Sequence, residues 1–172
     1  MAYVILGLLL IRPQSLYDLV KSFEAGVSLF YSASTGSIKR ALDGLLDRDR
    51  IEVASTEGGR GRKVYRVTDA GRDELEAWLT AEPTGDVETA ALSRLYFLGL
   101  LPAERRRAVL ERLVDRVEAG LADLERLGEQ VADLDVPADQ RDLARYQLAT
   151  LEYGLGSYRY ASSFFRGLLD EH

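Results

Sequence analysis

Hydrophobic residues near the start of the chain follow the spacing of helices. Residues 2–11 are apolar almost throughout and predict a buried helix. Pro13 follows this run, and proline disfavours helix in the residue that precedes it. Ser15 and Asp18 have the spacing of a partial capping box, so a second helix is expected from Ser15 to about Gly26.

A third helix is expected to begin near Ser34 and Thr35, because their hydroxyl groups suit an N-cap. The apolar residues of this segment share one helical face: Ile38, Ala41, Leu42, Leu45 and Leu46. The charged residues lie on the other face: Lys39, Arg40, Asp43 and Asp47. This pattern predicts a helix that packs on a core with one face and exposes the other.

The hydrophobic period then changes from that of a helix to that of a strand. Residues 51–56 and 63–68 each alternate between apolar and polar side chains, and a glycine-rich turn separates them. Two alternating runs around such a turn predict a β-hairpin. A fourth helix is expected to follow, with Thr68 or Asp69 as its cap.

The second half of the chain is predicted to be entirely helical. Residues 83–85, Pro-Thr-Gly, are typical of a short domain boundary. Beyond it we expect a helix over 87–101, a long helix over 103–134 and a last helix that Pro137 opens.

The long helix carries apolar residues three and four positions apart in alternation, which is the heptad pattern of a helical seam. These residues are Leu110, Leu113, Val117, Gly120, Leu124, Leu127, Val131 and Leu134. The period alone fits a helix pair within one chain as well as a dimer. The last helix is apolar and aromatic over much of its circumference, which favours cover by a second copy. The candidate dimer contacts are Leu110, Leu113, Val117, Leu124, Leu127, Leu151, Tyr158 and Phe165.

Composition excludes several classes of function. The 172 residues include no cysteine, which rules out a disulfide scaffold and a thiol nucleophile and fits the reducing cytoplasm. The only histidine is His172, so no Ser-His pair or histidine metal cluster exists, and no glycine-rich phosphate loop precedes a helix. The apolar start lacks the flanks of a signal peptide and is too short to span a bilayer. We therefore expect no enzyme, no cofactor, no metal and no membrane partner.

The charge distribution changes what the net charge of −6 implies, since an acidic total argues at face value against nucleic-acid binding. Residues 34–66 hold eight Lys and Arg residues against five Asp and Glu residues. Local charge governs a DNA-facing surface, so this segment can still bind DNA.

Three helices, a basic hairpin and a fourth helix, in this order, predict a winged helix-turn-helix. The predicted fold is mainly α with a small β-hairpin wing: a DNA-binding domain over 1–83 and a helical dimerisation and effector domain over 84–172. The third helix fits the major groove of DNA, and cations of the wing can contact phosphates or the minor groove. The candidate DNA contacts are Ser34, Thr35, Gly36, Ser37, Lys39, Arg40, Asp43, Arg60, Arg62 and Lys63. A winged helix that binds protein instead of DNA is the alternative.

Four segments resemble the PadR family of bacterial transcription regulators: residues 1–10, 15–19, 36–45 and 59–71. The resemblance implies a homodimer that represses transcription from a pseudo-palindromic operator on double-stranded DNA. It also implies a small aromatic effector, to which no residue of this chain is assigned. One departure is Lys39-Arg40, where family members commonly have a Tyr-Pro or Tyr-Arg pair; two adjacent cations favour phosphate contacts.

Overall fold

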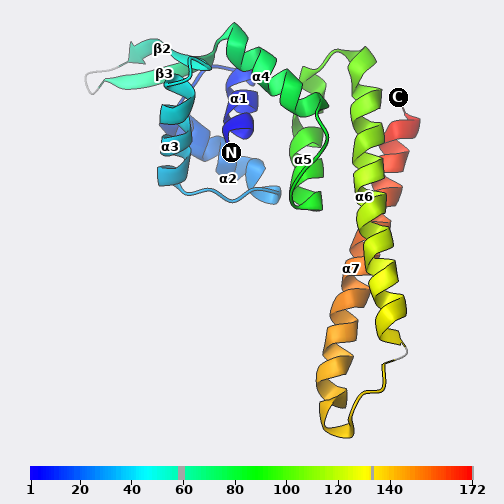
Figure 1. The fold of residues 1–172 in the computed structure, drawn as a ribbon. Coiled ribbons are helices and arrows are strands. Elements are labelled where there is room, and N and C mark those ends of the chain that lie inside the picture. Colours follow the sequence, from blue (N-terminus) through cyan, green and yellow to red (C-terminus); the bar gives the residue numbers. More distant parts are fainter. Residues whose placement is uncertain (58–60, 133, 172) are drawn as a thin grey trace. The chain divides into compact units, whose positions relative to one another are not determined.

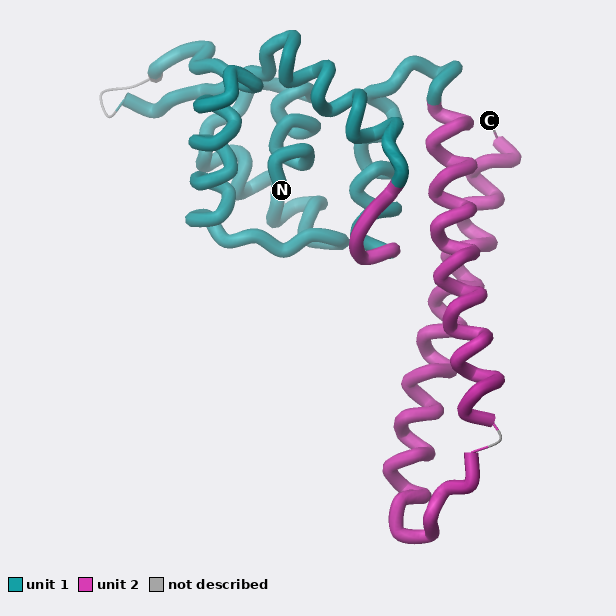
Figure 2. Tube along the Cα trace, in the orientation of Figure 1, with its two compact units in different colours: residues 1–82, 88–105 teal, residues 83–87, 106–172 magenta. Residues whose placement is uncertain are grey.

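The computed structural model describes residues 1–57, 61–132 and 134–171 (Figure 1). The chain forms two compact units, one of residues 1–82 with 88–105 and the other of residues 83–87 with 106–172 (Figure 2). This division differs from a single boundary after residue 83, because residues 88–105 join the N-terminal helices.

The first unit begins with three α-helices, of which the third is the one expected to face DNA. Their bounds are α1, Ala2–Ile11; α2, Leu16–Ala25; and α3, Thr35–Leu46. The capping box of α2 is complete: the Ser15 hydroxyl accepts the Asp18 N–H, and the Asp18 carboxylate accepts the Ser15 N–H at 3.0 Å. A short 3-10 helix, Val27–Leu29, follows α2 and was not predicted.

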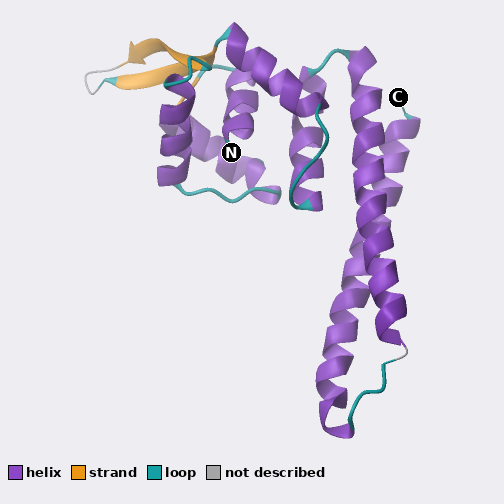
Figure 3. Cartoon of the chain, viewed as in Figure 1, coloured by secondary structure: helices purple, strands orange, loops and turns teal. Residues whose placement is uncertain are grey.

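The wing hairpin, drawn in orange in Figure 3, forms a three-stranded antiparallel sheet together with β1, and the strand order is β1-β3-β2. The hairpin strands are β2, Ile51–Glu57, and β3, Arg62–Val67, which confirms the predicted hairpin. The sequence did not predict β1, Gln14–Ser15, because two residues are too few to show alternation. Its residues pair with the root of the wing, Gln14 with Tyr65 and Ser15 with Val64.

Helices α4, Asp69–Thr80, and α5, Val87–Phe97, follow the sheet. Thr68 caps α4 through its hydroxyl, as predicted. The helix expected over 87–101 ends earlier, and a 3-10 helix, Leu98–Leu100, continues it. The largest fully buried side chains of this unit come from all five helices and from β2: Ile5, Leu6, Leu19, Ile38, Leu42, Leu45, Ile51, Leu75, Leu79 and Phe97.

The second unit is a pair of long helices, α6, Ala103–Ala132, and α7, Arg141–Asp170. Gly120 lies against the Tyr158 ring and Gly128 against Leu151, so the helices run antiparallel. Gly120, which interrupts the predicted heptad pattern, leaves the space that the Tyr158 ring fills. Helix α6 ends two residues before the predicted position, and α7 begins after a 3-10 helix, Ala138–Gln140, rather than at Pro137. None of the described helices combines the length and apolar character needed to span a membrane.

Candidate nucleic-acid interface

Helix α3 exposes a polar first turn and buries its apolar side. The Ser34 hydroxyl caps the helix by accepting the Ser37 N–H at 3.2 Å. Ile38, Leu42 and Leu45 are at most 1% exposed. The predicted DNA contacts of α3 are exposed except for the half-buried Ser37: Ser34, Thr35, Gly36, Lys39, Arg40 and Asp43. The exposed side of α3 is therefore the side that the amphipathic pattern predicted.

The two cations of α3 differ in their partners. The Lys39 ammonium donates to the Asp43 carboxylate at 2.7 Å, one helical turn away. This hydrogen bond raises the pKa of Lys39. Arg40 is exposed and has no ion pair within the described parts of the chain. Among the described residues, Arg40 is thus the α3 cation whose charge no acid compensates.

The cations of the wing show the same contrast. Arg62, at the start of β3, donates to Asp18 of α2 at 2.5 Å. Arg66 pairs with Glu52 across the hairpin at 2.6 Å. Lys63 is exposed and forms no ion pair with any residue of the described ranges. The predicted contact Arg60 lies outside the described residues.

Asp18 is the most strongly shifted carboxyl group near this surface. Its pKa falls from an ordinary value of 3.8 to about 2, chiefly because the Ser15 hydroxyl and backbone N–H donate to it and also because Arg62 does. Asp18 is therefore fully ionised at neutral pH and carries a permanent negative charge at the root of the wing.

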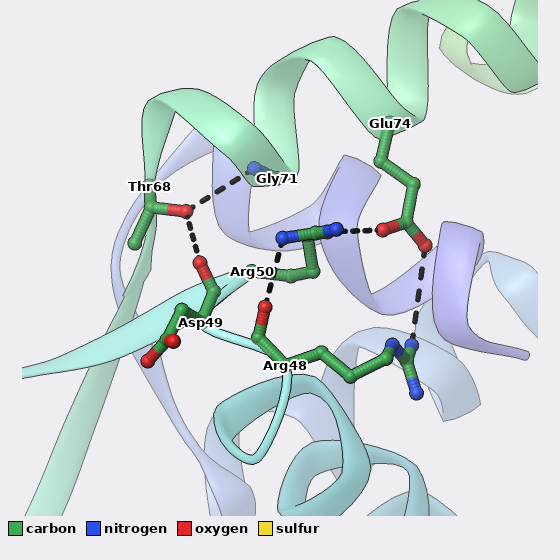
Figure 4. A network of polar contacts seen from close by, with 6 residues as sticks. All are labelled: Arg48, Asp49, Arg50, Thr68, Gly71 and Glu74. Carbon is green, nitrogen blue, oxygen red and sulfur yellow. Dashed lines mark hydrogen bonds and ion pairs between the residues drawn. The ribbon is translucent and has the colours of Figure 1, made fainter.

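A polar network joins the end of α3 to the start of α4 (Figure 4). Asp49 has a positive φ of 56°, and the Thr68 hydroxyl donates to its carbonyl oxygen at 2.7 Å. The same hydroxyl accepts the Gly71 N–H at 3.1 Å. A side chain at Gly71 would overlap the Arg50 carbonyl, so only glycine lets α4 approach this closely.

The charged half of the network centres on Glu74 of α4 (Figure 4). Its carboxylate accepts from Arg50 Nε at 2.5 Å and lies 3.9 Å from Arg48 Nη2. Arg50 also donates to the Arg48 carbonyl oxygen at 2.8 Å. Sequence reasoning missed these positioning residues, because no pattern along the chain relates Arg50 to an acid 24 positions away. The network braces the turn that connects α3 to the wing.

The candidate dimer residues separate into two groups. Within the chain itself Leu110, Leu113, Val117 and Phe165 are at most 2% exposed, so their side chains are already covered. Leu124, Leu151 and Tyr158 are half-buried, and Leu127 is exposed. The large exposed apolar side chains of α7 are others, which were not among the candidate dimer contacts: Leu143, Tyr146, Leu148, Tyr153, Tyr160 and Phe164. Apolar residues lie on both sides of α7, and the sequence could not tell which side the chain covers.

Helices α1 to α4 with the three-stranded sheet, followed by a helical C-terminal unit, define a winged helix-turn-helix protein of the transcription-factor class. The sequence model of the Transcriptional regulator PadR-like family matches residues 5–77, and that of the Virulence activator alpha C-term family matches residues 90–169. The Negative transcriptional regulator PadR of Bacillus subtilis is 30% identical over 127 residues, which cover 72% of this chain and 70% of that protein. The chain belongs to the PadR family of transcriptional regulators.

Two solved structures of Bacillus subtilis PadR are similar to this chain over nearly its whole length. Bacillus subtilis PadR in complex with operator DNA is 24% identical, with a TM-score of 0.43, and the match covers 99% of this chain and 97% of that one. Bacillus subtilis PadR in complex with p-coumaric acid is 25% identical, with a TM-score of 0.42, and the match covers 98% and 96%.

Proposed function

We propose that this regulator binds double-stranded DNA sequence-specifically through α3 and the wing, and that it represses transcription as a homodimer. The observation that carries the proposal is the exposed polar turn of α3, with Arg40 on α3 and Lys63 on the wing free of ion pairs within the described ranges. The similarity to a protein named a negative transcriptional regulator supports repression. The function is that of a cytoplasmic regulator rather than an enzyme.

The contacts divide by element. The first turn of α3 enters the major groove, where Ser34, Thr35 and Gly36 approach the bases. Arg40 and Lys63 contact phosphates, which provide affinity and salt dependence. In this assignment the unit of residues 1–82 with 88–105 binds DNA, and the unit of residues 83–87 with 106–172 forms the dimerisation and effector domain.

The dimer contact is the exposed face of α7. Tyr146, Tyr153 and Tyr160 recur every seven residues and are 69%, 78% and 73% exposed in the single chain. A second copy covers this face in a twofold-symmetric contact. Two α3 helices then lie about one DNA turn apart, roughly 34 Å, or a multiple of it, so the operator is a pseudo-palindrome.

A small aromatic effector regulates the complex. Bacillus subtilis PadR was solved with p-coumaric acid, and we extend to this chain only the class of compound, a planar aromatic acid. An effector shifts DNA affinity only by the difference in its own affinity for the DNA-bound and free forms. We assign no residue to this effector.

Fluorescence anisotropy with the DNA directly upstream of the protein's own gene tests DNA binding. Wild type should bind saturably in the presence of competitor DNA, and Arg40→Gln and Lys63→Gln should each reduce affinity. Each lost phosphate contact makes the slope of log K against log salt less negative by about 0.9. Arg126→Gln removes an exposed cation from α6 and is the matched control.

A selection from random duplexes covers the case in which the upstream DNA holds no operator. If no duplex is enriched and neutralising Arg40 and Lys63 changes nothing, DNA binding is wrong and the protein-binding winged helix is supported. Enrichment of a pseudo-palindrome that Arg40→Gln abolishes supports the proposal.

A further inference from the structure

One carboxylate oxygen of Asp18 accepts hydrogen bonds from three donors that belong to two parts of the fold. Asp18 Oδ2 accepts from the Ser15 N–H at 3.0 Å, from the Ser15 hydroxyl at 2.7 Å and from Arg62 Nη2 at 2.5 Å. The Ser15 contacts cap α2, whereas Arg62 begins β3. A helix cap and the root of the wing therefore share one carboxylate.

The backbone link between these two parts is short. Strand β1 contributes only two pairs to β3, at Gln14 and Ser15. The Gln14 side chain is 2% exposed and anchors β1, since it donates to the Leu8 carbonyl at 2.8 Å and accepts from the Ser22 hydroxyl at 2.7 Å. Arg62 lies two residues before Val64, the partner of Ser15, so its ion pair extends the link toward the wing turn.

We propose that Arg62 is a positioning residue: bound to Asp18, it holds the root of the wing against the N-terminus of α2, while Arg40 and Lys63 make the phosphate contacts. This inference rests on the proposed DNA binding. It changes the role that the sequence suggested for Arg62, from a DNA contact to a brace.

The charges support this division. The Arg62 and Asp18 pair has a net charge of zero, so its attraction for a phosphate is weak, and a phosphate beside Asp18 would meet a like charge. The Asp18 side chain is 30% exposed and the Arg62 side chain 49% exposed, so the pair is partly shielded from solvent. Arg40 and Lys63 have no such compensation in the described parts of the chain.

Amide hydrogen exchange tests the brace in the absence of DNA. Asp18→Asn keeps an acceptor for the helix cap but removes the ion pair, and Arg62→Gln removes the pair from the other side. Each variant should increase exchange at Val64 and Tyr65 several-fold, and the double variant should show no larger increase, because one interaction is lost in all three. Arg62→Lys should retain most of the protection.

Glu52→Gln is the matched control, since Glu52 pairs with Arg66 inside the hairpin and does not reach α2. It should leave exchange at Val64 and Tyr65 unchanged. Unchanged exchange in Asp18→Asn and Arg62→Gln would overturn the proposal, and so would additive effects of the two substitutions.

The effect of Asp18→Asn on DNA affinity has opposite signs for the two roles that Arg62 could have. If Arg62 contacts a phosphate, Asp18→Asn removes a competing negative charge and raises affinity, and Arg62→Gln makes the slope of log K against log salt less negative by about 0.9. If Arg62 is the brace, both variants lower affinity by the same factor and leave the salt slope unchanged, whereas Lys63→Gln makes the salt slope less negative. The first pattern overturns the inference and the second supports it.

The result that would refute DNA binding differs from the result that would refute the role of Arg62 as a brace. A wild-type protein that enriches no duplex refutes DNA binding and with it the phosphate contacts of Arg40 and Lys63. The exchange measurement still decides whether Arg62 braces the wing.

Discussion

The helices of the first unit and helix α7 of the second differ in how much of their apolar surface the chain itself covers. Six of the ten residues of α1 are buried, from Val4 to Leu9. Helix α7 has 30 residues, and Phe165 is the one that is buried. Nine of the ten residues of α1 are apolar, against half of the residues of α7, so composition explains part of the difference.

The rest of the difference lies in how many neighbours each helix has. Helix α1 lies among other helices and beside β3, which together bury its residues from Val4 to Leu9. Helix α7 packs on α6 through one side, where Tyr158 fills the space above Gly120. Its opposite side keeps Tyr153 and Tyr160 more than 70% exposed. The apolar side chains on this opposite side are the ones that the proposed second copy would cover.

The largest effect is expected from the core of the first unit. Leu45→Ala removes a side chain that is 0% exposed and should lower the free energy of unfolding by about 3 kcal/mol, because a cavity remains. Urea denaturation at one protein concentration measures it. Leu29→Ala, at a leucine that is 82% exposed in the same unit, should change stability by less than about 0.5 kcal/mol. Equal losses in both variants would contradict the contrast between buried and exposed leucines.

Substitutions on the exposed side of α7 should weaken dimerisation rather than the stability of the folded chain. Tyr153→Ser should weaken dimerisation by about 2 kcal/mol, roughly thirtyfold in the dissociation constant, as expected for a central aromatic contact. Sedimentation velocity over a dilution series measures it. Tyr17→Ser changes a tyrosine that is 65% exposed on α2 and should leave dimerisation unaffected. An unchanged dissociation constant for Tyr153→Ser would remove α7 as the partner surface.

A smaller effect is expected where charge, not packing, joins elements of the first unit. Glu74→Gln removes the ion pairs with Arg50 and Arg48, and the 26% exposure of the Glu74 side chain limits solvent screening. The expected loss is about 1 kcal/mol in the free energy of unfolding. Asp73→Asn, at the exposed neighbouring position, is the control and should be close to neutral. A loss as large as that of Leu45→Ala would mean that the network outweighs the core.

The smallest effect is a pH dependence. The pKa of Asp18 in the folded chain, about 2, lies below its ordinary value of 3.8. Its ionised form therefore stabilises the fold above about pH 4, and this stabilisation is lost as the pH falls toward about 2. The urea midpoints of wild type and Asp18→Asn should differ at neutral pH and converge in acid. A gap that persists at about pH 2 would assign the effect to the lost hydrogen bonds instead of the charge.

Much of the first unit could be predicted because its signals are local. The Ser15 and Asp18 capping box, the Ser34 cap and the two strands of the hairpin each depend on residues a few positions apart. The end of α6 is displaced by two residues and the start of α7 by four, and no side-chain hydrogen bond caps the start of α7. The exposed face of α3 was predicted for the same reason as its core face: the helical period separates them.

The features that were missed depend on distant pairs. Strand β1 exists only because β3 lies beside it, and two residues carry no period. Arg62 has its partner 44 residues away, and Arg50 has its partner 24 residues away. A basic residue in a wing predicts a phosphate contact from its sequence position alone, because that position does not show whether folding brings an acidic residue next to it.

The amino-acid sequence by itself determined the order of helices and strands, the polar face of α3 and the membership of a family of transcriptional regulators, because spacing and caps act over a few residues. Only the tertiary structure decided which cations are neutralised and which apolar side of α7 is left uncovered. Charge compensation and burial depend on side chains that folding brings together from distant positions. The residues proposed to touch DNA and the second copy therefore follow from the fold and not from the motifs alone.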